Sequence, residues 1–138
     1  MASVPYFAIP QAQQSGKIRL FKSYRAEVKD GEQKRDFVYV QDVVDPVVHF
    51  LDSTAPSGLY NAGTGHSRSF NDLARAIFSA LNLPEEIEYF EMPDAIKNSY
   101  QYFTEADMMK LSATGYHHDP VSLEEGISRY VKWLNAGI

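Results

Sequence analysis

The chain has 138 residues, of which 44% are hydrophobic, and it contains eight Phe, nine Tyr and one Trp but no cysteine. This length corresponds to about one domain, and the composition supplies enough apolar side chains for a core, which argues against disorder. Without cysteine the chain has no disulfide, thiolate zinc site or cysteine nucleophile. Its net charge of −5 and pI of about 5.3 disfavour a nucleic-acid-binding protein.

The sequence also shows no sign of a membrane protein. No apolar run approaches the roughly 18 residues that a membrane span needs. The first 16 residues lack the basic start of a signal peptide. We therefore expect a cytoplasmic protein with neither a membrane nor a nucleic acid as partner.

The first part of the chain combines an ambiguous apolar segment with a strand. Residues 1–16 are largely apolar, but Pro5 and Pro10 should limit any helix there to short pieces. Residues 18–22 alternate between apolar and charged side chains, which is typical of a strand. The polar residues 23–36 predict a long solvated loop, and long ordered loops often carry function.

A second strand and an unusually apolar helix follow this loop. Residues 36–41 are rich in β-branched and aromatic side chains, which favour a strand. Asp42 can cap a helix that runs to about Asp52. Apolar side chains lie nearly all round this helix, which indicates that it is covered on more than one side. A turn at 56–58 and a short strand at 59–62 come next.

Three helix starts share one signature, a hydroxyl residue followed three positions later by a carboxylate. This arrangement is typical of a capping box or its shorter aspartate variant. The predicted helices span residues 70–82, 105–114 and 123–135, and a further strand is expected at 87–90. The resulting order of elements is an α/β pattern without an internal repeat.

The glycine pair Gly63 and Gly65 precedes the helix that starts after Ser69, as in a phosphate-binding loop. Glycines before a helix N-terminus can bind anions through backbone N–H groups. The third glycine of a dinucleotide motif is absent, because Arg68 stands in its place. The residues alone therefore favour a tight strand-to-helix turn over an anion site.

Two basic residues, Lys34 and Arg35, precede the predicted strand at 36–41. The planar fork of arginine suits a diphosphate, which it can bind through two oxygens at once. The alternative is a surface cation beside Glu32 and Asp36, and the residues alone favour that alternative.

Aromatic residues gather in the segment 100–104, near Lys97. A phenol can donate a hydrogen bond to a ligand phosphate or hydroxyl, and a ring can stack on a base. The alternative, an ordinary half-buried strand or extended segment, is slightly favoured by the residues alone.

The histidines give weak signals. His117, His118 and Asp119 are adjacent and no further ligand stands at a suitable spacing, so a metal site is disfavoured. His49 is expected to pack on its helix. No Tyr-x-x-x-Lys pair and no serine, histidine and carboxylate set with nucleophile spacing occurs, so these residues alone build no catalytic site.

Two motifs stand close together in the middle of the chain: RDFVYV with a following aspartate at 35–42, and YNAGTG at 60–65 with Ser69 after it. Together they resemble the C-terminal half of extended short-chain dehydrogenases/reductases that act on nucleotide sugars. Further segments narrow the resemblance to the ADP-glycero-manno-heptose 6-epimerases of that family, and they lie at 1–4, 19–22, 30–37, 100–107, 115–116 and 133–135.

The resemblance implies an α/β substrate-binding portion, with short strands, about four to five helices and no complete Rossmann domain. Residues 1–138 are then one C-terminal substrate-binding domain, a fragment whose segment 36–66 packs on a missing Rossmann domain. The parent enzyme is implied to use NADP, bound by its N-terminal domain, and to invert C6 by oxidation to a carbonyl and return of the hydride to the other face. This reaction serves the lipopolysaccharide inner core.

The resemblance also implies the roles of individual residues. Catalytic, cofactor-binding and metal-binding residues are not expected in this chain, which should be inactive alone. Phe7 stands where the family usually has a histidine, and the loop at 23–34 is longer than in the shortest members. The residues implied to contact the ADP-sugar are Phe21, Lys22, Ser23, Tyr24, Arg35 and Tyr100.

Two other readings stay open. The chain can be a stand-alone binding or interaction module derived from the family, or part of a UDP- or dTDP-sugar epimerase or dehydratase. In either case an uncovered domain interface exposes apolar surface and a strand edge, which favour association. We therefore expect a homo-oligomer or self-association through this interface.

Overall fold

The computed structural model describes residues 3–52, 54–117 and 119–137, and within these ranges it contains six helices and four strands. Four helices have 12 or 13 residues, whereas two have only four. The elements in chain order are α1 (Val4–Ser15), β1 (Ile18–Phe21), β2 (Lys34–Arg35), α2 (Val40–Asp52), β3 (Arg68–Ser69), α3 (Phe70–Leu81), β4 (Ile87–Phe90), α4 (Asp94–Lys97), α5 (Met109–Ser112) and α6 (Leu123–Asn135).

The strands form two separate two-stranded sheets, which confirms the expected α/β class with short strands. β1 and β4 are parallel, with Ile18 opposite Ile87 and Phe21 opposite Phe90. β2 and β3 are antiparallel and only two residues long. No helix in the described ranges has the length and apolar character to cross a membrane.

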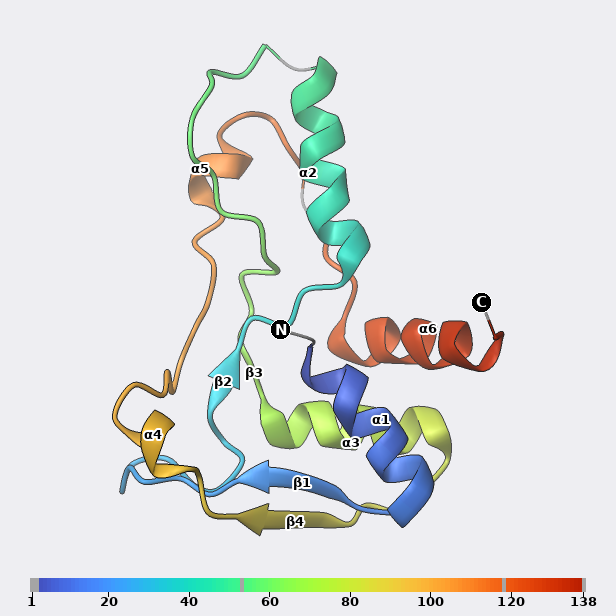
Figure 1. The fold of residues 1–138 in the computed structure, drawn as a ribbon. Coiled ribbons are helices and arrows are strands. Elements are labelled where there is room, and N and C mark those ends of the chain that lie inside the picture. The colour runs from blue at the N-terminus through green and yellow to red at the C-terminus, as the bar shows by residue number, and fades with distance from the viewer. Residues whose placement is uncertain (1–2, 53, 118, 138) are drawn as a thin grey trace.

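The hydrophobic core lies where α1, β1, α3 and α6 meet, at the bottom of Figure 1. Helix α3 is at its centre because its apolar residues recur on one face, where Ile77 and Phe78 are at most 1% exposed. The expected capping box at its start is present: the Ser69 hydroxyl accepts from the Asp72 amide, and the Asp72 carboxylate accepts from the Ser69 amide. Asn82 ends the helix with φ 54°, in the left-handed region.

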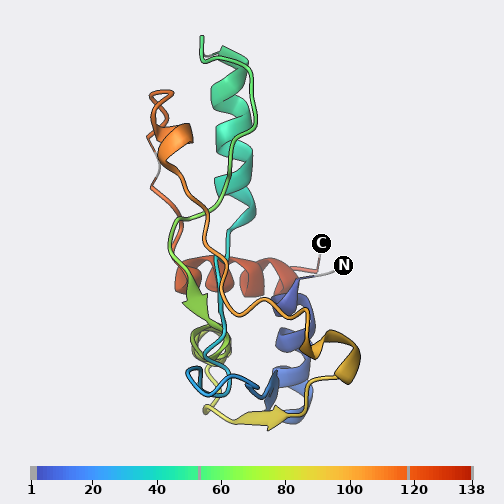
Figure 2. The same ribbon diagram turned by 90° about the vertical axis from the view of Figure 1, so that its left-hand side faces the viewer.

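A second region rises from this core and is here called the arm, residues 40–62 and 107–121 without the undescribed positions. Helix α2 forms one side of the arm and α5 the other, and both stand apart from the core in the two views of Figures 1 and 2. The apolar side chains of α2 are largely exposed, among them Val47 at 61% and Leu51 at 77%. The arm therefore holds much apolar surface that the described chain does not cover.

The structure corrects the expectation for the N-terminal segment, which is one helix rather than short pieces. Pro5 lies in the first turn, where its missing N–H is no loss. Pro10 lies inside the helix and removes one hydrogen bond, but Ile9 and Ala12 beside it are buried against the core. Their burial offsets the cost of the internal proline.

The expected strand at 36–41 is also wrong, since the pairing stops at Arg35 and α2 already begins at Val40. Asp42 lies in the first turn of α2 and does not cap it. Its buried carboxylate accepts instead from the backbone N–H of Val121, at 3.1 and 3.3 Å. This bond ties the start of α2 to the segment before α6.

Two further elements of the arm differ from expectation. Residues 59–62 form no strand, as they have no partner strand within the described ranges. The helix expected at 105–114 is reduced to α5, and the segment before it lies along β2: the Thr104 amide donates to the Lys34 carbonyl and the Ala106 amide to the Asp36 carboxylate. These tertiary hydrogen bonds hold residues 104–106 outside the helix.

Candidate functional site

An aromatic cluster lies at the carboxyl ends of the parallel strands β1 and β4. The rings of Phe21 and Phe90 end the two strands side by side, with centroids 4.9 Å apart. The Tyr100 ring meets the Phe21 ring edge to face with centroids 6.0 Å apart, and it meets the Tyr102 ring in the same way with centroids 5.6 Å apart. The structure thus brings the end of β1 together with the segment that follows α4.

Arg35 joins this cluster from β2. Its guanidinium carbon lies 5.2 Å from the centre of the Tyr100 ring and 5.6 Å from that of Phe70. Rings attract a cation through their negative faces, which fixes the guanidinium without neutralising it. One of its nitrogens donates to the Lys34 carbonyl at 2.8 Å.

The two carboxylates near Arg35 in sequence do not pair with it. Glu32 accepts from the Asn71 side chain at 2.6 Å, and Asp36 faces the loop of Thr64 and Gly65. Successive side chains of an extended segment point to opposite sides, which separates Arg35 from Asp36. Within the described ranges Arg35 has no ion pair, so its charge is available to an anion.

Tyr100 is a hydrogen-bond donor at neutral pH. Burial of its hydroxyl raises the pKa of Tyr100, and the nearby positive charge of Arg35 opposes that shift only in part. The phenol therefore stays protonated beside the guanidinium. Together they present one neutral donor and one charged donor on neighbouring segments.

The other predicted residues lie around this pair but differ in what they contact. The ammonium of Lys22 forms an exposed ion pair with Glu91 at 2.8 Å. The amide of Ser23 donates to the Asp30 carboxylate at 2.7 Å, which folds the loop back on itself. The amide of Tyr24 donates to the Tyr102 hydroxyl at 2.9 Å, so it is linked to the aromatic cluster through its backbone.

Sequence reasoning missed several neighbours of these residues. Tyr102 is 9% exposed and connects Tyr24 to Tyr100. The ammonium of Lys97 lies 4.3 Å above the Tyr24 ring, and the Tyr24 hydroxyl donates to Glu91. The alternation of aromatic residues at 100–104 was the available signal for Tyr102. No local pattern indicates that α4 places Lys97 over the loop at 23–34.

The loop of Gly63, Thr64 and Gly65 already holds an anion, and that anion is the carboxylate of Asp36. The Thr64 and Gly65 amides donate to it at 2.9 and 3.0 Å. Burial by itself would raise the pKa of Asp36, but these bonds and those from the Thr64 hydroxyl and the Ala106 amide outweigh it and lower the pKa. The structure therefore favours the tight turn, and these amides do not fit a cofactor phosphate.

The histidines carry no site within the described ranges. No group of three metal-ligating side chains occurs there. His118, one of the three residues of the weak metal pattern, lies outside the described residues. The ring of His49 packs against Tyr116 at 5.4 Å and lies 3.1 Å from the Thr114 hydroxyl, as expected for a packing role.

Comparison with known proteins finds similar sequences and structures. The sequence profile of the NAD dependent epimerase/dehydratase family matches residues 5–63. An ADP-L-glycero-D-manno-heptose-6-epimerase from Fusobacterium nucleatum subsp. nucleatum is 46% identical over an alignment of 138 positions, which covers 96% of this chain and 42% of that protein.

Solved structures agree with this match. The crystal structure of Helicobacter pylori ADP-L-glycero-D-manno-heptose-6-epimerase is 27% identical with a TM-score of 0.76, over 99% of this chain and 38% of that one. A UDP-N-acetylglucosamine 4-epimerase from Methanobrevibacter ruminantium M1, in complex with UDP-N-acetylmuramic acid, has a TM-score of 0.77 at 22% identity, over 99% and 40% of the chains. That likeness shows the fold alone.

The chain spans about two fifths of the length of these relatives. The matches confirm the resemblance inferred from the RDFVYV and YNAGTG motifs, and the family profile covers the first of them. The chain is thus similar to part of the ADP-L-glycero-D-manno-heptose-6-epimerases, and its residues 5–63 match the NAD dependent epimerase/dehydratase family.

Proposed function

We propose that this chain provides the substrate-binding part of an epimerase that inverts C6 of an ADP-activated glycero-manno-heptose for the lipopolysaccharide inner core. NADP, held by the part of the family fold that this chain does not span, would accept the C6 hydride and return it to the other face. The chain alone would be inactive and cytoplasmic. The 46% identity with an ADP-heptose epimerase supports the choice of sugar nucleotide.

The observation that carries the proposal is the guanidinium of Arg35 held over the Tyr100 ring at 5.2 Å. A diphosphate offers paired anionic oxygens to the fork of Arg35, while the Tyr100 phenol donates a further hydrogen bond. The aromatic surface of Phe21 and the loop from Lys22 to Tyr24 border this pair and would lie along the ADP moiety. A charged group that lacks an ion pair in the described part of the chain and is fixed between rings suits an anionic ligand.

A titration of the chain with ADP, UDP and dTDP, followed by calorimetry, tests the proposal. We expect ADP to bind best and Arg35→Ala to weaken it at least tenfold, since a charge-assisted bidentate contact is lost. Arg75→Ala is the matched control, because Arg75 lies on α3 in exposed ion pairs with Asp72 and Glu85. Tighter binding of UDP or dTDP than of ADP would favour the UDP- or dTDP-sugar alternative, and an unchanged affinity in Arg35→Ala would contradict the site.

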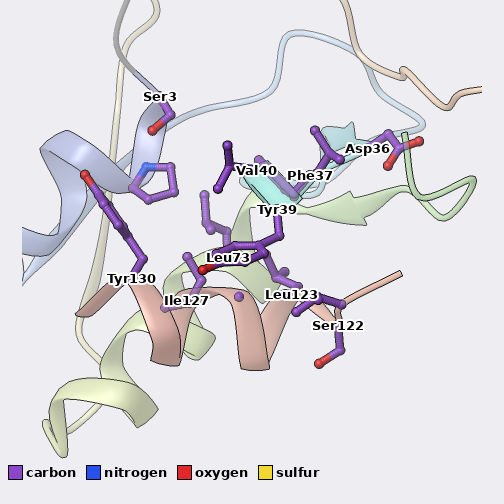
Figure 3. Close-up of a pocket in the computed structure, with 14 residues that line it drawn as sticks. Ser3, Asp36, Phe37, Tyr39, Val40, Leu73, Ser122, Leu123, Ile127 and Tyr130 are labelled. Atoms are coloured by element: carbon purple, nitrogen blue, oxygen red, sulfur yellow. The ribbon is translucent and has the colours of Figure 1, made fainter. Parts of the chain in front are cut away.

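A second proposal concerns the arm, whose apolar surface favours association. Helix α2 exposes several valines. At the base of the arm an apolar cavity of about 470 Å³ lies between residues 36–40, α3 and α6. Figure 3 shows Leu73, Leu123 and Ile127 in its wall, facing Phe37 and Tyr39. We propose that this surface packs on the cofactor-binding portion in a full-length relative and mediates self-association of the chain by itself.

Sedimentation velocity over a range of protein concentrations tests the second proposal. We expect dimers or larger species that dissociate when Val47 is changed to Glu, because a charge there breaks an apolar contact. Glu27→Gln, in the solvated loop, is the control. A stable monomer at all concentrations, with slow amide exchange along α2, would overturn the proposal and show that the arm is stable without a cover.

A further inference from the structure

We propose that Asp36 is a positioning residue: its carboxylate fixes the distance between Arg35 and Tyr100 by fastening the segment that follows Tyr100 to the end of β2. Arg35 comes from one segment and Tyr100 from another, 65 positions along the chain. A ligand that contacts both residues requires these segments to be held in one arrangement.

Both oxygens of the Asp36 carboxylate are used in this arrangement. One accepts from the Thr64 amide at 2.9 Å and from the Thr64 hydroxyl at 2.5 Å. The other accepts from the Gly65 amide and the Ala106 amide, each at 3.0 Å. One side chain thus joins three parts of the chain: the end of β2, the Gly63–Gly65 loop and the segment before α5.

The bond to Ala106 continues a ladder that begins at β2. The Lys34 amide donates to the Tyr102 carbonyl at 2.9 Å, and the Thr104 amide donates to the Lys34 carbonyl at 3.3 Å. Asp36 adds the next link on the same two segments through its side chain. Arg35 lies between these links, and Tyr100 lies two positions before the first of them, so the ladder sets their separation.

The loop around Asp36 is shaped to let the carboxylate in. A Cβ atom on Gly63 would lie 2.6 Å from an Asp36 oxygen and 2.6 Å from the Cβ of Ala106. Gly65 has φ +72°, in the region that favours glycine, and this conformation turns its amide toward the same carboxylate. The two glycines of the YNAGTG motif thus serve an internal aspartate, a role that the phosphate-loop hypothesis did not include.

The test compares Asp36→Asn with Asp42→Asn in this chain. Asp42 is the control, since its carboxylate also accepts from a backbone amide and is more buried than that of Asp36, but its partner is Val121 and not the 102–106 segment. The first readout is the NMR signal of the Arg35 side chain, which the Tyr100 ring shifts at 5.2 Å. We expect Asp36→Asn to lose this shift and Asp42→Asn to keep it.

The second readout is the affinity for ADP, and this part rests on the proposed substrate site. We expect the affinity to fall about tenfold in Asp36→Asn and to stay unchanged in Asp42→Asn. Thr64→Val removes only the hydroxyl donor and should give an intermediate change of both readouts, which keeps the test open if Asp36→Asn does not fold. Denaturation midpoints measured alongside separate a general loss of stability from a loss of position.

Each outcome decides between the alternatives. An Arg35 signal that is unchanged in Asp36→Asn, or changed equally by Asp42→Asn, would overturn the proposal. A wild-type chain that binds no ADP but shows the Arg35 shift only with Asp36 intact would contradict the proposed function and support the positioning role.

Discussion

The core and the arm use similar residues with opposite results. Helices α3 and α2 are both strongly apolar, yet Ile77 of α3 is fully buried and Val47 of α2 is 61% exposed. The difference lies in their neighbours: α3 is packed by α1, β1 and α6, whereas α2 faces away from them. An apolar helix face therefore indicates that some partner covers it. It does not indicate whether that partner belongs to the same polypeptide segment.

The largest difference between the two regions should appear on truncation of a core side chain. Phe78→Ala removes a ring that is 1% exposed, and we expect the free energy of unfolding to fall by about 3–5 kcal/mol. Urea denaturation followed by far-UV circular dichroism measures this loss. A loss below about 1 kcal/mol would mean that the core collapses around the gap and is less closely packed than α3 indicates.

Sequence patterns predicted α3, β1 and β4 of the core and α2 of the arm, but they missed α1 and the form of residues 59–62 and 105–114. Much of the difference lies in the range of the interactions. The α3 boundaries follow from the Ser69 and Asp72 capping box and from Asn82, all within one local stretch. The β1 and β4 strands follow from alternation. By contrast, residues 104–106 lie along β2 and Asp36 instead of starting a helix, and Asp36 is 70 positions away from its partner Ala106.

The candidate site shows the same limit. The residues alone favoured Arg35 as a surface cation, because Glu32 is three positions away and Asp36 is adjacent. In the folded chain both carboxylates serve other donors, and Arg35 turns to Tyr100. Only the family resemblance connected Arg35 with Tyr100 beforehand, since no local pattern joins residues from such distant segments.

Glycine substitutions should distinguish the junction of core and arm from the core itself. Gly63→Ala places a Cβ 2.6 Å from Asp36 and from Ala106, and we expect it to destabilise the chain by about 1–3 kcal/mol. Gly126→Ala, inside α6, meets only the Tyr39 ring at 3.5 Å, and should stabilise the chain by about 0.5–1 kcal/mol. Thermal denaturation of both variants gives the sign directly, and a Gly63→Ala variant as stable as the wild type or more stable would refute the tight junction.

A smaller effect is expected at the start of α3. Asp72→Asn weakens the capping box and should cost about 1 kcal/mol at neutral pH. Burial tends to raise the pKa of Asp72, but hydrogen bonds from Ser69 and Arg68 lower it overall. A lowered pKa in the folded chain means that the stabilisation is present above about pH 4 and is lost as the pH falls through the folded pKa.

Denaturation of wild type and Asp72→Asn at pH 7 and near pH 3 measures this dependence. The two proteins should differ at pH 7, and the difference should shrink towards pH 3 as the wild-type carboxyl becomes protonated. A difference that persists undiminished would show that the charge of Asp72 is not what stabilises the helix start.

The smallest effect on the monomer should come from the arm. Val47→Ala removes two methyl groups from a side chain that is 61% exposed, so we expect the free energy of unfolding to change by less than about 0.5 kcal/mol at low protein concentration. At high concentration the same change should lower the apparent stability more, because association stabilises the folded state by mass action and needs this surface. A loss of several kcal/mol at low concentration would place Val47 inside a packed interior, and the contrast between arm and core would then be one of shape rather than of burial.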